Sequence, residues 1–156
     1  MAERRTTRSA PKISGTATGH GAQHHATPAD GSFDVQLQML PGITPREEQE
    51  FEQGLTRYLQ DRDLLGEGTP LAMTIRGDGR ELSTTDQVDL ILWLMQASPV
   101  ATVWISHPTE DGETQGAGDR AGWLRASRCD LAVPLALQLY RLGRIGPTIV
   151  AQVLSP

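Results

Sequence analysis

The earliest clear pattern is a two-residue alternation between residues 33 and 39. Its apolar members would face a core and its polar members would face solvent, as in a strand with one wet face. The members are Phe33, Val35, Leu37 and Met39, which alternate with Asp34, Gln36 and Gln38. Pro41 and Gly42 follow, so we expect the strand to end there.

A helix is predicted to begin directly after this strand. Thr44 is suited to cap the exposed amides, Pro45 to occupy the first helical position, and Glu47 to complete a capping box. The expected buried stripe consists of Phe51, Leu55, Tyr58 and Leu59. Glutamates crowd the first turns, where the helix dipole favours negative charge.

A hairpin is predicted next. Residues 61–68 read as a turn, and Leu71, Met73 and Ile75 alternate as a strand. The glycines of Gly77-Asp78-Gly79 permit a tight reversal, so we expect residues 80–82 to return as a short second strand.

A second amphipathic helix is predicted from residue 84. Thr84 and Gln87 match a capping box, and the helix is expected to end before Ser98-Pro99. Apolar residues occupy most of its circumference, namely Val88, Leu90, Ile91, Leu92, Trp93, Leu94 and Met95. Residues 100–105 then read as a strand with an apolar finish.

The C-terminal part shows helical spacing followed by an apolar run. The repeat of Leu131, Leu135, Leu139 and Leu142 predicts a helix with Asp130 as its cap and Gly143 as its stop. Residues 148–154 read as a late strand. Val133, Leu137 and Tyr140 enlarge the apolar face, so this unit needs cover from the main sheet or from another subunit, and the sequence leaves both open.

Together these elements predict an α+β fold, a small and mostly antiparallel sheet backed by two helices. The expected organisation is a disordered basic tail at residues 1–31, a core domain at 32–107, a flexible Gly-rich acidic loop at 108–122, and a helix–strand extension at 123–156. At 156 residues, the chain suits one modest domain with tails.

Composition narrows the class of protein. Cys129 is the single cysteine, which excludes an intramolecular disulfide framework and fits a reducing compartment. Arg4, Arg5 and Arg8 are not followed by the apolar stretch of a signal peptide, and no run is long enough to span a bilayer. We therefore expect a cytoplasmic protein with no membrane partner.

Charge is unevenly placed along the chain. The formal net charge is −5, but residues 32–120 hold sixteen acidic and six basic side chains, while both flanking segments are net positive. Basic side chains of the N-terminal tail are therefore the expected contacts with nucleic acid: Arg4, Arg5, Arg8 and Lys12.

No residue cluster demands a particular reaction. The spacing of His20, His24 and His25 would allow a shared metal ion, but a tail without ordered second-shell partners argues against a deliberate site. The glutamates of the first helix have a structural explanation as first-turn charges, and His107 lacks a recognisable nucleophile. No catalytic residue, metal or cofactor is predicted.

Several of these signals, taken in order, resemble the YggL-type proteins, a small bacterial family associated with the large ribosomal subunit. They are Phe33 and Val35, Pro41-Gly42, Thr44-Pro45, Glu47-Glu48, the strand from Gly68 to Ile75, the turn at Gly77–Gly79, the helix start at Thr84–Gln87, and Trp93-Leu94. The resemblance covers about half of the chain. It implies a four-stranded, antiparallel-rich sheet backed by two helices, and binding to ribosomes or their precursors without catalysis.

The leading functional prediction is a non-enzymatic binding protein associated with the ribosome or with translation. A long N-terminal tail and some fifty extra C-terminal residues depart from the family's pattern and put its partner in question. One alternative is an acidic inhibitor or immunity-type protein that blocks a basic site on another protein through Glu47, Glu48, Glu50 and Glu52. Another is a structural subunit of a larger assembly.

Overall fold

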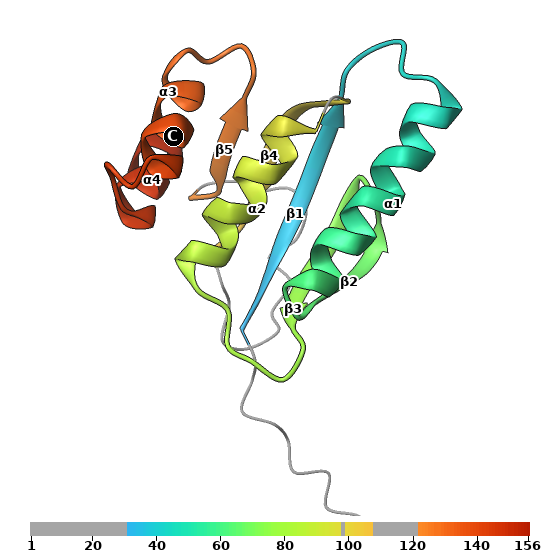
Figure 1. The fold of residues 1–156 in the computed structure, drawn as a ribbon, viewed down its shortest axis with the longest axis horizontal. Helices are drawn as coiled ribbons and strands as arrows, with labels where there is room; N and C mark the ends of the chain where they lie inside the picture. Colours follow the sequence, from blue (N-terminus) through green and yellow to red (C-terminus); the bar gives the residue numbers. More distant parts are fainter. Residues whose placement is uncertain (1–30, 98, 108–121) are drawn as a thin grey trace, which may run out of the picture.

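The computed structural model describes residues 31–97, 99–107 and 122–156. These residues form a five-stranded sheet and four helices (Figure 1), which confirms the predicted α+β class. The elements in chain order are β1 (Ser32–Met39), α1 (Pro45–Asp61), β2 (Leu64–Thr69), β3 (Ala72–Gly77), α2 (Thr84–Gln96), β4 (Val100–Ile105), β5 (Leu124–Ser127), α3 (Ala132–Arg141) and α4 (Pro147–Leu154).

The sheet has the order β2-β3-β1-β4-β5, and every neighbouring pair is antiparallel. Its first four strands and two helices follow the β-α-β-β-α-β sequence of a ferredoxin-like unit. The fifth strand pairs Ile105 with Leu124 and Thr102 with Ser127, so it shields the edge of β4. The C-terminal unit therefore completes the main sheet.

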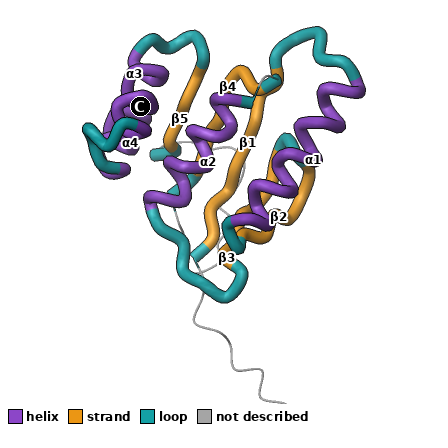
Figure 2. Tube along the Cα trace, in the orientation of Figure 1, coloured by secondary structure: helices purple, strands orange, loops and turns teal. Residues whose placement is uncertain are grey.

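Helices α1 and α2 cover one face of the sheet, and α3 and α4 lie beside α2, next to β5 (Figures 1 and 2). The predicted alternation of β1 is confirmed, because its apolar side chains face the helices. Phe33, Val35, Ile75, Val103 and Ile105 are almost completely buried there. Their burial against α1 and α2 is the main source of stability for this layer.

The two predicted helix starts differ in accuracy. Thr44 and Glu47 form the expected capping box of α1. The cap of α2 lies one residue earlier than predicted, because Ser83 and Asp86 form the box. Gln87 is instead buried, and its amide donates a hydrogen bond of 2.7 Å to the Ser106 carbonyl oxygen.

The predicted hairpin was wrong in its second strand. The partner of β3 precedes it, since β2 occupies most of the segment expected to be a turn, and residues 80–82 form no strand. Leu64 pairs with Gly77, and the Asp78 amide donates to the Asp63 carbonyl at 2.8 Å. The Arg80 side chain turns away toward Asp86.

The helix predicted from the Leu131 to Leu142 repeat is confirmed as α3, together with its predicted end at Gly143. Gly143 has a φ of +67°, and the amides of Gly143 and Arg144 donate to the carbonyls of Tyr140 and Leu139, as in a Schellman motif. Asp130 accepts a hydrogen bond from the Ala132 amide, although Leu131 holds the cap position. Strand β5 was not predicted.

The predicted late strand at residues 148–154 was wrong, because the segment forms helix α4. Pro147 occupies its first turn, where a missing amide hydrogen costs nothing. Val150 and Leu154 are buried one helical turn apart. This packing outweighs the strand preference of the β-branched residues in the segment.

None of the described helices has the length and apolar character needed to cross a bilayer. The predicted tail, apart from Gly31, and the predicted loop, apart from Gly122, lie outside the described residues.

Candidate binding surfaces

The structure places the four predicted glutamates on the first half of α1, and all are exposed. Glu47 serves the helix itself. Its carboxylate accepts hydrogen bonds of 2.8 Å from the backbone amide and the hydroxyl of Thr44. The hydrogen bond from the Thr44 backbone amide is the larger cause, and that from the Thr44 hydroxyl the smaller, of a lowered pKa at Glu47.

The other three glutamates remain at the surface. Glu50 accepts a hydrogen bond of 2.8 Å from Arg46, but the two side chains are 61% and 87% exposed, so the pair contributes little to stability. Glu48 and Glu52, one helical turn apart, form no ion pair within the described part of the chain. This end of the molecule thus presents uncompensated negative charge.

A hollow of about 240 Å³ lies beside these glutamates, between α1 and the end of α2. Glu47 and Glu50 stand at its rim, and Phe51 and Trp93 form its aromatic wall. The ring centroids of Phe51 and Trp93 are 6.1 Å apart. Carboxylates next to aromatic faces suit a cationic side chain, through charge and cation–π attraction together.

A polar network joins three helices near the opposite end of α1. Asp89 of α2 accepts a hydrogen bond of 2.6 Å from Arg62 and one of 2.8 Å from the Tyr140 hydroxyl. The Arg62 guanidinium lies 5.0 Å from the centre of the Tyr58 ring. Burial raises the pKa of Tyr58 to about 12. Burial, followed by the bond to Asp89, raises the pKa of Tyr140 to about 12.

This network is suited to holding helices together and poorly suited to proton transfer. A general acid or base works best with a pKa near the operating pH. Every described group with a resolved shift moves away from neutrality: the pKa values of Glu47 and Asp86 are lowered, and those of Tyr58, Arg62, Arg80 and Tyr140 are raised.

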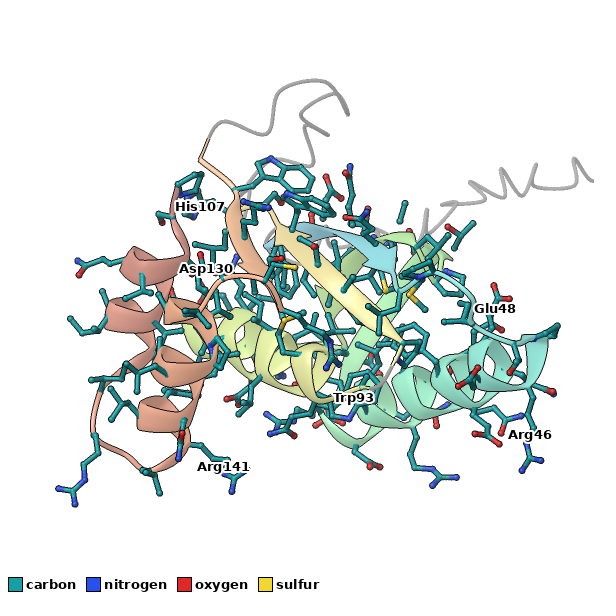
Figure 3. The ribbon with its side chains drawn as sticks, turned by 90° about the horizontal axis from the view of Figure 1, so that it is seen from above. Arg46, Glu48, Trp93, His107, Asp130 and Arg141 are labelled. Atoms are coloured by element: carbon teal, nitrogen blue, oxygen red, sulfur yellow. The ribbon has the colours of Figure 1, made fainter. Side chains whose placement is uncertain are left out.

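A second and larger groove, of about 440 Å³, separates α2 from α3. Its apolar lining comes from Leu92 and Met95 on α2 and from Val133 and Leu137 on α3. Arg141 stands at its margin, at the end of the molecule opposite Glu48 (Figure 3). Sequence reasoning missed this groove, because its two walls lie forty residues apart in the chain.

The uncovered face of the sheet carries cross-strand polar pairs. The Thr74 hydroxyl donates a hydrogen bond of 2.7 Å to Asp34, and Arg76 pairs with Glu67. Ferredoxin-like RNA-binding domains stack bases on aromatic side chains of their central sheet. Strands β1 and β3 present no aromatic side chain on this face, whereas the other neighbour of β1, strand β4, places Trp104 there, paired with Gln36. A row of aromatic side chains across β1 and β3 is therefore missing.

Other predicted residues lie apart from these surfaces or outside the described residues. Arg4, Arg5, Arg8, Lys12, His20, His24 and His25 all belong to the undescribed segment 1–30. Within the described ranges, no three His, Cys, Asp or Glu side chains are placed to hold a metal ion. Cys129 is exposed, and the neighbouring Arg128 donates to the carbonyls of Ala97 and Val100.

No protein-family model, curated protein or solved structure matches this chain. The predicted kinship with the YggL-type family therefore stays a prediction.

Proposed function

We propose that this chain is a non-enzymatic binding protein of the translation machinery that docks onto the ribosome or its precursors. The observation that carries the proposal is a separation of charge across one scaffold. Helix α1 carries four glutamates and Asp61 against Arg46 and Arg57, whereas the segment from β5 to α4 carries four arginines against Asp130. Figure 3 shows Glu48 and Arg141 at opposite ends of the molecule. Ribosomes combine anionic RNA with basic protein, so such a scaffold offers each a complementary surface.

The basic tail adds a second contact in this proposal. Arg4, Arg5, Arg8 and Lys12 would engage RNA phosphates or a protein groove. Binding through phosphates releases counterions, so the affinity is expected to fall steeply with salt. This role requires a location in the cytoplasm.

Sedimentation of cell extract through a sucrose gradient tests the proposal directly. The full chain is expected to travel with ribosomal subunits at low salt and to be released at high salt. Deleting residues 1–31 is expected to shift it toward the top of the gradient. A full chain that remains at the top at every salt concentration would contradict ribosome association.

A second candidate function is an acidic inhibitor that occupies a basic site on another protein. The acidic rim and aromatic wall of the hollow beside α1 favour it, since they suit an Arg or Lys side chain. Charge reversal by Glu50→Lys, at the rim of the hollow, should abolish such binding, and Glu81→Lys, elsewhere on the surface, should leave it intact. If only the tail deletion matters, the inhibitor function is excluded.

A further inference from the structure

The groove between α2 and α3 combines an apolar lining with positive charge. Leu92 and Met95 are partly exposed although they pack against the core. Arg141 is exposed and forms no ion pair within the described part of the chain. A flexible Met side chain lets such a surface adapt to a partner. The groove thus combines apolar contact area with an arginine, Arg141, whose charge is available to a partner.

The apolar surface continues beyond the groove along the outside of α3. Leu131, Leu135 and Leu142 are 89%, 59% and 61% exposed. Helical geometry places all three on the same face of α3 as Gln138, which also lines the groove. Exposed aliphatic side chains gathered on one helix face mark an interaction surface more often than a solvated one.

Charge and composition argue against two possible ligands of this groove, the N-terminal tail and a second copy of the chain. The tail at residues 1–31 is basic and almost without large apolar residues, so Arg141 repels it and the groove gains little from it. A second copy packed through the same face would bring Arg141 near its own counterpart. Helix α1 of a second copy has the right charge, but its apolar stripe is already buried against its own sheet.

We propose that the groove between α2 and α3 binds an amphipathic helix of another protein, one that carries acidic residues beside its apolar stripe. The apolar stripe would cover Leu92 and Met95 in the groove and Leu135 beside it, and a carboxylate would pair with Arg141, as in the helix-in-groove mode of recognition. A concave groove accepts the ridge of a helix, whereas a flat membrane surface leaves it unfilled. This binding does not depend on ribosome association.

A synthetic amphipathic helix with Leu on one face and Glu on the other is a suitable probe. Binding of the fluorescently labelled probe to the full chain is measured by anisotropy, and the groove is located by amide chemical shifts of Leu92, Met95 and Leu137. Arg141→Glu is expected to weaken binding by at least about tenfold. Leu135→Ser is expected to weaken it as well, whereas the matched charge reversal Arg57→Glu on α1 should have no effect.

Three comparisons make the result decisive. A scrambled Leu/Glu peptide and a Leu/Lys helix should bind much more weakly than the probe, and equal binding by either would overturn the proposal. So would a probe that fails to bind, or that binds equally to the Arg141→Glu variant. Self-association of the chain, or binding to anionic vesicles, that is lost in Leu135→Ser while the probe does not bind would assign the surface to those partners instead.

Discussion

Tyr140 of α3 donates its phenolic hydrogen to Asp89 of α2 across 2.8 Å. The other oxygen of the same carboxylate accepts from Arg62, just past the end of α1. One side chain of α2 therefore connects elements on both sides of it, which lie about eighty residues apart in the sequence. The C-terminal unit is held to the core by this polar contact as well as by strand β5 and the buried face of α4.

Replacing Tyr140 by Phe removes only the hydroxyl that reaches Asp89. Hydrogen bonds to charged groups contribute more than neutral ones, so we expect the free energy of unfolding to fall by about 1.5 kcal/mol. Urea unfolding at neutral pH measures the change. In a double-mutant cycle with Asp89→Asn, the two effects should be less than additive; full additivity would show that the two side chains do not interact.

The corresponding change at the other tyrosine should have the opposite sign. The Tyr58 hydroxyl is buried and has no hydrogen-bond partner in the described structure. Removing a buried, unpaired polar group relieves its desolvation penalty, so Tyr58→Phe is expected to raise the free energy of unfolding by about 1 kcal/mol. The same urea experiment tests it. A clear loss of stability would indicate that the hydroxyl has a partner after all.

Both tyrosines should make the fold sensitive to alkali. The pKa of each is raised to about 12, above the usual value of 10, so the folded state holds protons that the unfolded state releases. Neither group lowers the stability of the fold through ionisation below pH 10, and stability is lost as the pH rises from 10 toward 12. Since the chain has two Tyr residues, absorbance at the tyrosinate band reports them directly.

The titration should show little tyrosinate until well above pH 10, with both residues then ionising together with unfolding. Tyr58→Phe isolates Tyr140, and Tyr140→Phe isolates Tyr58. A residue that ionises near pH 10 in the folded protein would show that its environment is wetter than the structure indicates.

The sequence predicted correctly those elements in which the capping residues and the spacing of apolar residues indicate the same kind of structure. The alternation from Phe33 and the box at Thr44 and Glu47 both identified their elements correctly. Strand β2 was missed because Gly66 and Gly68 interrupt the alternation of apolar and polar residues. The strand forms because it pairs with β3 along its whole length, from Leu64 to Thr69. Helix α4 was mistaken for a strand because residues of its own sequence favour strands, whereas contacts with α2 and α3 decide its form.

A candidate surface could be predicted from the sequence only where all of its residues belong to one helix. The glutamates of α1 were expected to be exposed, and they are. Trp93 was predicted only as one of the apolar residues around its helix. The structure shows it half-buried, where it lines a hollow together with Phe51 and Gly54 of α1. The groove between α2 and α3 depends on the distance between two helices, which no periodicity in either helix reports.

Asp86 should make the protein sensitive to acid. Its burial acts to raise the pKa, but hydrogen bonds from Arg80 and Ser83 outweigh burial and hold the pKa below its ordinary value of 3.8. The carboxylate therefore stabilises the fold above about pH 4, and this contribution is lost as the pH falls through the lowered pKa. Asp86→Asn is expected to cost about 1 to 2 kcal/mol at pH 7, through the lost capping box and ion pair.

Urea unfolding at pH 7 and pH 3 measures this effect. The difference between the wild type and Asp86→Asn should be smaller at pH 3, because the unfolded wild type then binds a proton that the folded carboxylate, with its lowered pKa, resists. Glu52→Gln, which removes an exposed carboxylate of α1 beyond its first turn, serves as the control and should change stability little at either pH. An equal deficit of Asp86→Asn at both pH values would mean that packing, and not charge, is responsible.

Two glycines, in contrasting surroundings, test the packing that positions the hairpin and α1. A methyl group on Gly77 would lie 1.9 Å from the Arg80 carbonyl oxygen, so the backbone must move, and Gly77→Ala is expected to cost about 2 to 3 kcal/mol. A methyl group on Gly54 would meet the Trp93 ring at 3.5 Å, an ordinary contact. Because Ala also favours a helix interior, Gly54→Ala should add about 0.5 to 1 kcal/mol. Thermal unfolding of both variants measures the changes, and a Gly77→Ala variant as stable as the wild type would disprove the tight turn that ends β3.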